Sequence, residues 1–142
     1  KGDIPYIEEN QDSLQPVYYH DASGTYLGEL TTYYADGSMK NEVNHELTIS
    51  EITFDSVRIS GISTILTWDI NAYLYRVPDG IYLAFQEMVN EDEVIRGVPL
   101  SGRPDYNGIY AITTKYLEYS IEVISGADTT IQYYFGKNNS NE

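Results

Sequence analysis

Short runs in which apolar and polar residues alternate, separated by turn-forming residues, recur along the chain from residue 24 onward. The first run, Gly24–Tyr34, is rich in threonine, tyrosine and leucine, and Asp36 and Gly37 follow it almost at once. This composition is typical of a β-strand, and an Asp-Gly pair readily adopts the positive φ angles of a tight hairpin turn. The pattern predicts eight or nine strands, depending on whether residues 109–124 form two strands or one; those after the first span residues 39–49, 51–59, 69–77, 81–88, 94–100, 109–114, 115–124 and 129–135.

Two stretches leave the local structure open. In the third expected strand, Ile52 and Phe54 share one parity, whereas Val57 and Ile59 share the other. A one-residue slip moves side chains to the opposite face of a sheet, so we expect a bulge or a turn between these pairs, at residues 55–56. Residues 61–66 are too few for an independent helix and fit either a helical turn or a connector.

The clearest hairpin surrounds residues 78–80, a Pro-Asp-Gly sequence that places proline and glycine where a turn needs them. On its second strand Ile81, Leu83 and Phe85 occupy alternate positions, so one face of this strand is apolar. Such alternation is typical of a half-buried antiparallel strand. Residues 101–108 form the longest turn-rich segment between strands, and we expect a loop there.

The strands define one domain between two polar ends. Residues 1–23 are polar and acidic and read as an extended leader, residues 24–136 as the folded domain, and residues 137–142 as a polar tail. Even strand spacing without a convincing helix predicts an all-β fold, an antiparallel up-and-down barrel of eight strands or, alternatively, a β-sandwich. The deciding feature is whether the strand at 24–34 pairs with the strand at 129–135, because that pairing closes a barrel.

Charge and cysteine content restrict the partners. The chain carries 22 acidic and 8 basic residues, a net charge of −14, and no cysteine. Nucleic acids and anionic lipid headgroups both require a basic surface, so neither is an expected partner. Without cysteine, disulfides and thiolate metal sites are excluded. No apolar run reaches membrane-spanning length, and a sequence that starts at Lys1 is compatible with a removed N-terminal anchor, which is the only membrane link we expect.

No motif indicates catalysis or a cofactor. The two histidines, His20 and His45, lie far apart in the sequence and form none of the usual metal or hydrolase spacings. Residues 87–93 are rich in acidic side chains but lack the glycine of a calcium-binding loop, and a solvated charged turn explains them better. We therefore expect a protein that is not an enzyme and holds no metal.

The opening of the first strand, Gly24-Thr25-Tyr26-Leu27-Gly28, resembles the first strand of calycin-like (lipocalin-like) β-barrel domains. Tyr26 stands where lipocalins place the tryptophan of their Gly-x-Trp motif. The acidic leader, the absence of cysteine and the 15 tyrosines resemble secreted lipoproteins of Bacteroides-type bacteria. The resemblance implies a barrel with one open mouth and a small ligand inside, in a protein that is secreted or held in the cell envelope as a lipoprotein.

In such a barrel some side chains would face the ligand and others would rim the mouth. The expected inward-facing residues are Tyr26, Leu30, Leu83 and Phe85, and the expected rim residues, in the loop 101–108, are Arg103 and Tyr106. A cation beside an aromatic ring suits carboxylate or sugar ligands.

We therefore expect a monomeric, non-catalytic binding domain for a small apolar or sugar-like ligand. The alternative is a structural or protein-interaction module of a surface lipoprotein, with a barrel filled by its own side chains. A continuous cavity favours the first function, and a packed interior with an exposed apolar patch favours the second.

Overall fold

The computed structural model describes residues 20–78 and 80–139; residues 1–19, the greater part of the expected leader, lie outside the described residues, as do 140–142. A short 3₁₀ turn, η1 (His20–Ala22), precedes the strands. The strands are β1 (Gly24–Tyr34), β2 (Met39–Thr53), β3 (Ser56–Ser60), β4 (Ile70–Val77), β5 (Gly80–Phe85), β6 (Met88–Asn90), β7 (Glu93–Gly97), β8 (Gly108–Ala111), β9 (Tyr116–Ser125) and β10 (Asp128–Asn138).

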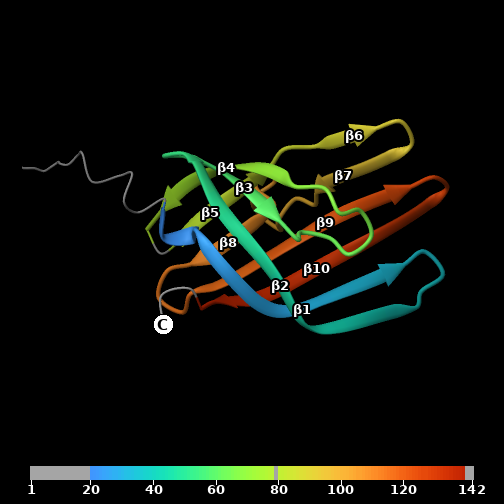
Figure 1. The fold of residues 1–142 in the computed structure, drawn as a ribbon, viewed down its shortest axis with the longest axis horizontal. Helices are drawn as coiled ribbons and strands as arrows, with labels where there is room; N and C mark the ends of the chain where they lie inside the picture. Colours follow the sequence, from blue (N-terminus) through green and yellow to red (C-terminus); the bar gives the residue numbers. More distant parts are fainter. Residues whose placement is uncertain (1–19, 79, 140–142) are drawn as a thin grey trace, which may run out of the picture.

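The strands form an antiparallel ring. β1 to β5 pair in chain order, β5 pairs with β8, β8 with β9, and β9 with β10. β10 then pairs with β1 from Tyr26 to Tyr34, which closes a ring of eight strands. The short hairpin of β6 and β7 lies outside this ring and joins it through the second half of β9 (Figure 1). The predicted all-β, eight-stranded antiparallel architecture is confirmed.

Several strand boundaries differ from the expected ones. Residues 51–53 end β2 instead of beginning β3, because the chain turns at Phe54 and Asp55, where the parity of the apolar residues changes. The expected strand 81–88 is divided between β5 and β6. Residues 109–124 form two strands, separated by a turn in which Lys115 adopts a φ of 67°. Residues 61–69 form a connector without a helix.

The two ends of the barrel differ in what covers them. The hairpin tips β1–β2, β6–β7 and β9–β10 lie at one end, which we call the mouth end, on the right of Figure 1. The opposite end, the base, holds η1 and the last residues of β10. There the hydroxyl of Tyr26 donates a hydrogen bond to the carbonyl of Ala22 at 2.5 Å, and both residues are fully buried.

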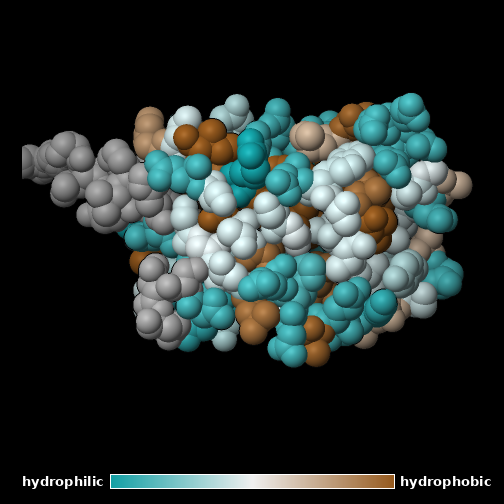
Figure 2. Space-filling model, in the orientation of Figure 1, coloured by the Kyte–Doolittle hydropathy of each residue, from teal (hydrophilic) through white to brown (hydrophobic). Residues whose placement is uncertain are grey.

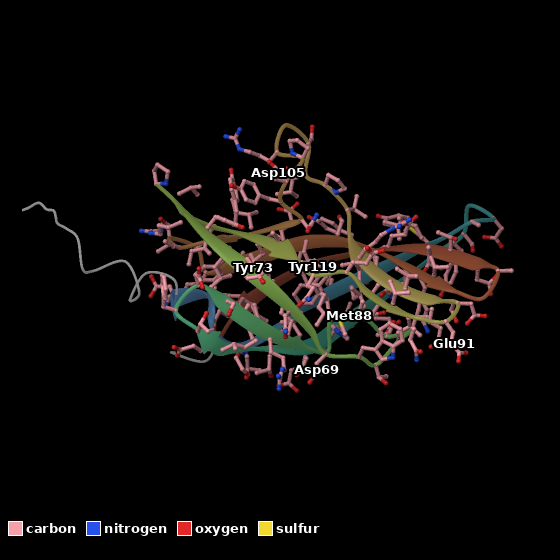
Figure 3. The ribbon with its side chains drawn as sticks, turned by 90° about the horizontal axis from the view of Figure 1, so that it is seen from above. Asp69, Tyr73, Met88, Glu91, Asp105 and Tyr119 are labelled. Carbon is pink, nitrogen blue, oxygen red and sulfur yellow. The ribbon has the colours of Figure 1, made fainter. Side chains whose placement is uncertain are left out.

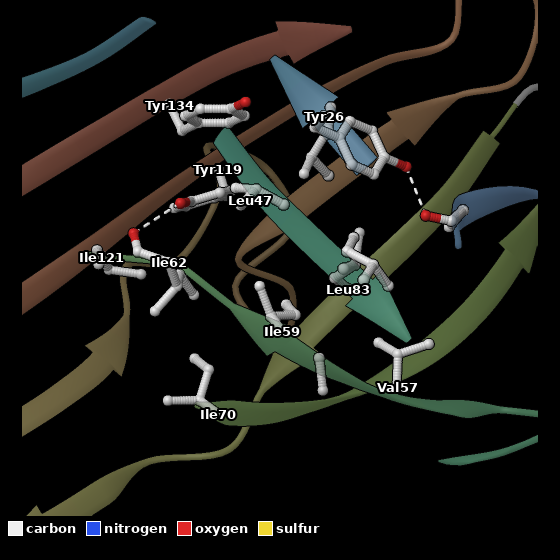
Figure 4. Packing of buried hydrophobic residues seen from close by; sticks show 14 of the residues in the cluster. Tyr26, Leu47, Val57, Ile59, Ile62, Ile70, Leu83, Tyr119, Ile121 and Tyr134 are labelled. Carbon is white, nitrogen blue, oxygen red and sulfur yellow. Dashed lines mark hydrogen bonds between the residues drawn. The ribbon is translucent and has the colours of Figure 1, made fainter. Parts of the chain in front are cut away.

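The interior of the barrel is filled by the side chains that point inward from alternate strand positions (Figure 4). The ring of Tyr119 stacks on that of Tyr134 with centroids 5.2 Å apart, and its hydroxyl donates to the carbonyl of Ile62 at 2.7 Å. A barrel of eight strands is just wide enough for its own side chains to fill it. The cluster includes Tyr26, Leu30, Leu47, Ile49, Val57, Ile59, Ile62, Ile70, Leu74, Ile81, Leu83, Leu117, Tyr119, Ile121 and Tyr134.

Glycine allows the ring to close where β1 meets β10. Gly28 is paired with Gly136, and a Cβ atom on Gly28 would overlap the Cα atom of Gly136. A Cβ atom on Gly136 would in turn overlap the ring of Tyr134. The second glycine of the first strand therefore permits a close approach of two backbones.

Candidate functional site

Four of the six predicted site residues lie in the packed interior or against it. Tyr26, Leu30 and Leu83 have no exposed surface, and none of them lines the two best-formed pockets of the described residues. Phe85 is partly buried, and its ring meets that of Tyr119 edge to face with centroids 5.4 Å apart. These four side chains pack against other parts of the barrel and fill the space that a ligand in the interior would need.

The other two predicted residues, Arg103 and Tyr106, lie together, but on the outer wall of the barrel. The ring of Tyr106 lies 4.9 Å from that of Tyr82 on β5 and 5.2 Å from that of Tyr75 on β4, measured between centroids. Tyr75 and Tyr82 are opposite each other in the β4–β5 ladder and point outward. We call Tyr75, Tyr82, Tyr106 and Arg103 the tyrosine cluster.

Arg103 is held in the cluster by a tyrosine. Its Nε donates to the hydroxyl of Tyr82 at 3.3 Å, and its Cζ lies 5.9 Å from the centroid of the same ring. This hydrogen bond raises the pKa of Arg103 above its ordinary value, so the guanidinium stays charged. Among residues 20–78 and 80–139, no carboxylate lies close enough to form an ion pair with Arg103.

The loop that carries Arg103 and Tyr106 is fixed to the barrel by Asn107. The side-chain oxygen of Asn107 accepts a hydrogen bond from the backbone N–H of Phe85 at 2.9 Å. The backbone N–H of Asn107 donates to the carbonyl of Leu83 at 2.8 Å. Within the loop, the N–H of Leu100 donates to the carbonyl of Tyr106 at 2.8 Å. The cluster is thus preformed and does not depend on a ligand to order it.

Two further side chains border the cluster. Tyr73 precedes Tyr75 on the outward face of β4 and is 55% exposed. Asp105 lies in the loop, which rises away from the strands above Tyr73 in Figure 3. Sequence reasoning identified the loop residues of this site and missed the strand tyrosines. The available signal was the Tyr-x-Tyr spacing of residues 73–75, which places both rings on one face.

A separate cavity of about 600 Å³ lies at the mouth end. The tip of the β1–β2 hairpin forms one wall, the tip of the β9–β10 hairpin forms the other, and the connector 61–69 contributes one residue. The lining residues are Tyr34, Ala35, Asp36, Ser38, Ile65, Val123, Ser125, Ala127, Asp128, Thr129 and Thr130. We call this space the mouth cavity; none of its lining residues was predicted.

The core is polar next to the mouth cavity. Gln132 on β10 has no exposed surface, and its amide makes three hydrogen bonds. Its oxygen accepts from the hydroxyl of Ser63 at 2.6 Å, and its nitrogen donates to the hydroxyls of Thr32 at 2.9 Å and Thr64 at 3.0 Å. These bonds attach the connector to β1 and β10. A buried polar network of this kind fixes one arrangement when each member has a partner.

The described part of the chain contains no cluster of histidine and acidic residues that could hold a metal ion. His45 lies in β2, and its Nε2 is 2.6 Å from the carbonyl oxygen of Gly61. The ring therefore contacts the start of the connector. Within the same residues, no helix has the length and apolarity needed to cross a membrane.

Comparison with known proteins gives one structural likeness. No protein-family model matches the chain, and no curated protein matches it. A crystal structure of a "putative outer membrane protein" from Bacteroides fragilis matches with a TM-score of 0.58 and 14% sequence identity over 87% of this chain. The chain spans about half, 53%, of that protein. At this identity the likeness shows a shared fold, and function must be argued from the site.

Proposed function

We propose that this chain is a non-catalytic binding domain of the cell envelope and that it binds a neutral sugar-like ligand on the tyrosine cluster. The observation that carries the proposal is the meeting of three tyrosine rings with a guanidinium that no described carboxylate neutralises. Ring faces bind ligands by packing, and a charged guanidinium binds them by hydrogen bonds, so both groups suit a binding role.

The chemistry of the cluster fits a saccharide. One face of a pyranose ring is lined with C–H groups and packs on an aromatic ring, and the hydroxyl groups at its edge need both donors and acceptors. Arg103 offers donors, and the exposed carboxylate of Asp105 in the same loop offers acceptors. The net charge of −14 opposes an anionic ligand, which favours a neutral sugar.

The proposed site differs from the expected one in its place. A ligand in the barrel would have to displace Tyr26, Leu30 or Leu83, which are fully buried. Removing such side chains from a packed core costs several kcal/mol each, on the order of 2–5. Binding on the outer wall needs no such rearrangement.

Location in the cell envelope is supported by the likeness to the Bacteroides fragilis protein, which is described as a putative outer membrane protein, and by the resemblance of the acidic, cysteine-free chain to secreted lipoproteins. A lipid anchor on a preceding segment would hold the domain at the membrane surface. Detection of the protein in membrane fractions, and its release by a lipoprotein-specific lipase, would test this part independently of ligand binding.

Titration with neutral tetrasaccharides of glucose, mannose and xylose tests the binding function. We expect at least one to shift the backbone amide signals of Tyr73, Tyr75 and Tyr82 and of residues 105–107 to saturation. Tyr106→Ala should weaken that binding by about tenfold, because it removes one of the stacked rings. The matched control is Tyr116→Ala, which removes an exposed ring from another wall of the barrel. Absence of saturable shifts, or equal loss in both variants, would overturn the proposal.

Protein interaction is the second candidate, and one observation favours it. The exposed rings of Tyr116 and Phe135 stack with centroids 4.6 Å apart, and Leu27 on β1 lies diagonally from Phe135. On the face shown in Figure 2, however, hydrophobic residues form separate small patches among polar ones. Analytical ultracentrifugation should give a monomer; an oligomer that Phe135→Ser dissociates would favour the interaction function instead.

A further inference from the structure

The mouth cavity has the volume of a site for a small organic molecule. Its volume of about 600 Å³ lies within the range of about 300–1,000 Å³ that is usual for ligand pockets. It belongs to different elements from the tyrosine cluster, since it lies between the hairpins β1–β2 and β9–β10 and opens to solvent. A ligand there would not compete with one on the outer wall.

The charged side chains that line the mouth cavity are all negative. Asp36 and Asp128 line it, and none of its lining residues is lysine, arginine or histidine. Asp92, in the β6–β7 turn, lies behind the β9–β10 tip, where its carbonyl accepts a hydrogen bond from the N–H of Gly126 at 3.1 Å. A cleft lined by one sign of charge concentrates counter-ions of the opposite sign.

The basic residues on the adjoining strands β2 and β7 have acidic partners of their own. Lys40 on β2 lies 3.8 Å from the carboxylate of Glu42. Arg96 on β7 lies 2.7 Å from Glu122 and 3.7 Å from Glu87. Neither of these cations lines the cavity, so within the described residues its lining carries only the negative charge of the two aspartates.

One carboxylate is oriented by its own turn. The Oδ1 atom of Asp36 accepts hydrogen bonds from the N–H of Ser38 at 2.9 Å and from its hydroxyl at 2.6 Å. These bonds lower the pKa of Asp36 and keep it ionised. They also fix the side chain at the hairpin tip with one oxygen engaged and the other available to a ligand.

The rest of the lining is largely apolar and rigid. Ile65, Val123, Ala35 and Ala127 present methyl and methylene groups, and Tyr34 presents a half-exposed ring. The connector that carries Ile65 is held by the amide of Gln132, through its bonds with the hydroxyls of Ser63 and Thr64. The N–H of Ile65 donates to the same serine hydroxyl at 3.0 Å.

We propose that the mouth cavity is a second binding site, which takes a small organic cation with an ammonium group on an apolar body. The ammonium group binds at the carboxylates of Asp36 and Asp128, and the ring of Tyr34 adds a cation–π contact. The apolar body packs on Ile65 and Val123. Both a charge and an apolar body are needed, because an exposed ion pair alone contributes little free energy.

The test compares two probes of the same shape, 2-phenylethylammonium and the uncharged 2-phenylethanol. We expect the cation to shift the amide signals of residues 34–38 and 123–130 to saturation, and to bind about tenfold more tightly than the alcohol. Raising the salt concentration from low to about 1 M should reduce this advantage, because it shortens the Debye length to about 3 Å.

Substitutions locate the site. Asp128→Asn should weaken binding of the cation by about fivefold and leave binding of the alcohol unchanged. Asp105→Asn, a matched change in the outer-wall loop, should have no effect on either probe. Asp128 is exposed at a hairpin tip, so we expect the variant to fold, and its thermal unfolding curve verifies this.

Two results would overturn the inference. Equal affinity for both probes would mean that the aspartates do not select charge, and an absence of saturable shifts for the cation would mean that the cavity is no site. The result is independent of the proposed sugar-binding function, because Tyr106→Ala, which should impair sugar binding, should leave binding of the ammonium probe unchanged.

Discussion

Three tyrosines of the barrel interior and three of its outer wall differ in what their hydroxyl groups do. The interior tyrosines Tyr26, Tyr119 and Tyr134 each donate a hydrogen bond to a backbone carbonyl, at 2.5, 2.7 and 3.1 Å respectively. All three have no exposed surface. Their hydroxyls therefore attach η1, the connector and β2 to the core.

The wall tyrosines contact one another instead. Tyr106 packs on Tyr75 and Tyr82, and the hydroxyl of Tyr82 accepts its hydrogen bond from Arg103. Tyr75 keeps 44% of its surface exposed. A tyrosine that points inward in the strand alternation thus serves packing. A tyrosine that points outward leaves a ring face exposed to a ligand.

The largest expected difference between the interior and the wall tyrosines is the effect of their ionisation on stability at alkaline pH. Burial raises the pKa of Tyr26, Tyr119 and Tyr134 well above the ordinary tyrosine value of about 10. The unfolded chain releases these protons near pH 10, whereas the folded barrel releases them only at higher pH. Their stabilising contribution is therefore complete below about pH 10 and is lost as the pH rises above it.

We expect the free energy of unfolding to fall steeply above about pH 10. Absorbance at 295 nm, which reports tyrosinate, should show a phase that coincides with loss of the β-sheet circular dichroism signal. In Tyr119→Phe, which carries one buried phenol fewer, the fall should be shallower. Complete ionisation of the tyrosines in a protein that retains its native circular dichroism would contradict this prediction.

The next largest expected difference is in the stability that is lost when one interior or one wall tyrosine is truncated to alanine. Tyr119→Ala should destabilise the protein by about 3–5 kcal/mol, because it leaves a large cavity and an unpaired Ile62 carbonyl. Tyr75→Ala, on the exposed wall, should cost less than about 1 kcal/mol. Urea unfolding followed by circular dichroism measures both values, and similar costs would show that the wall tyrosines also support the fold.

Strand parity explains which parts of this structure could be predicted from the sequence. The bounds of β1 and the inward positions of Tyr26, Leu30 and Leu83 follow from the alternation of apolar residues, which a half-buried strand imposes. The phase break expected at residues 55–56 indicated a bulge or a turn, and the chain does turn there, one residue earlier, at Phe54 and Asp55. The alternation of apolar residues is sufficient for features whose physical cause lies within a few residues of the chain.

The placement of the functional side chains has causes that lie far apart in the sequence. Tyr106 reaches the outer wall because Asn107 bonds to Phe85, a residue 22 positions earlier. Gln132 occupies an inward position that the alternation rule reserves for apolar residues, and its partner Ser63 is 69 positions away. A single sequence gives no sign of either pairing. For this reason Arg103 and Tyr106 were expected at the rim of the mouth, whereas the structure places them on the outer wall.

The smallest expected effect concerns one hydroxyl group of the wall. Tyr82→Phe removes the acceptor of the Arg103 hydrogen bond and keeps the ring on which Tyr106 packs. Because the bond is exposed, we expect the free energy of unfolding to change by less than about 1 kcal/mol. Hydrogen exchange should nevertheless accelerate at the amide of Arg103, and sugar affinity should fall by about two- to fivefold as the guanidinium loses its fixed position.

The control is Tyr75→Phe, since the Tyr75 hydroxyl has no hydrogen-bond partner among the described residues. This variant should exchange and bind as the unmodified protein does. Equal effects in both variants would mean that the hydroxyls matter to the ligand directly, and no effect in either would mean that Arg103 is positioned by stacking alone. Only a loss confined to Tyr82→Phe assigns that hydroxyl the role that the interior tyrosines have, which is to hold another element in place.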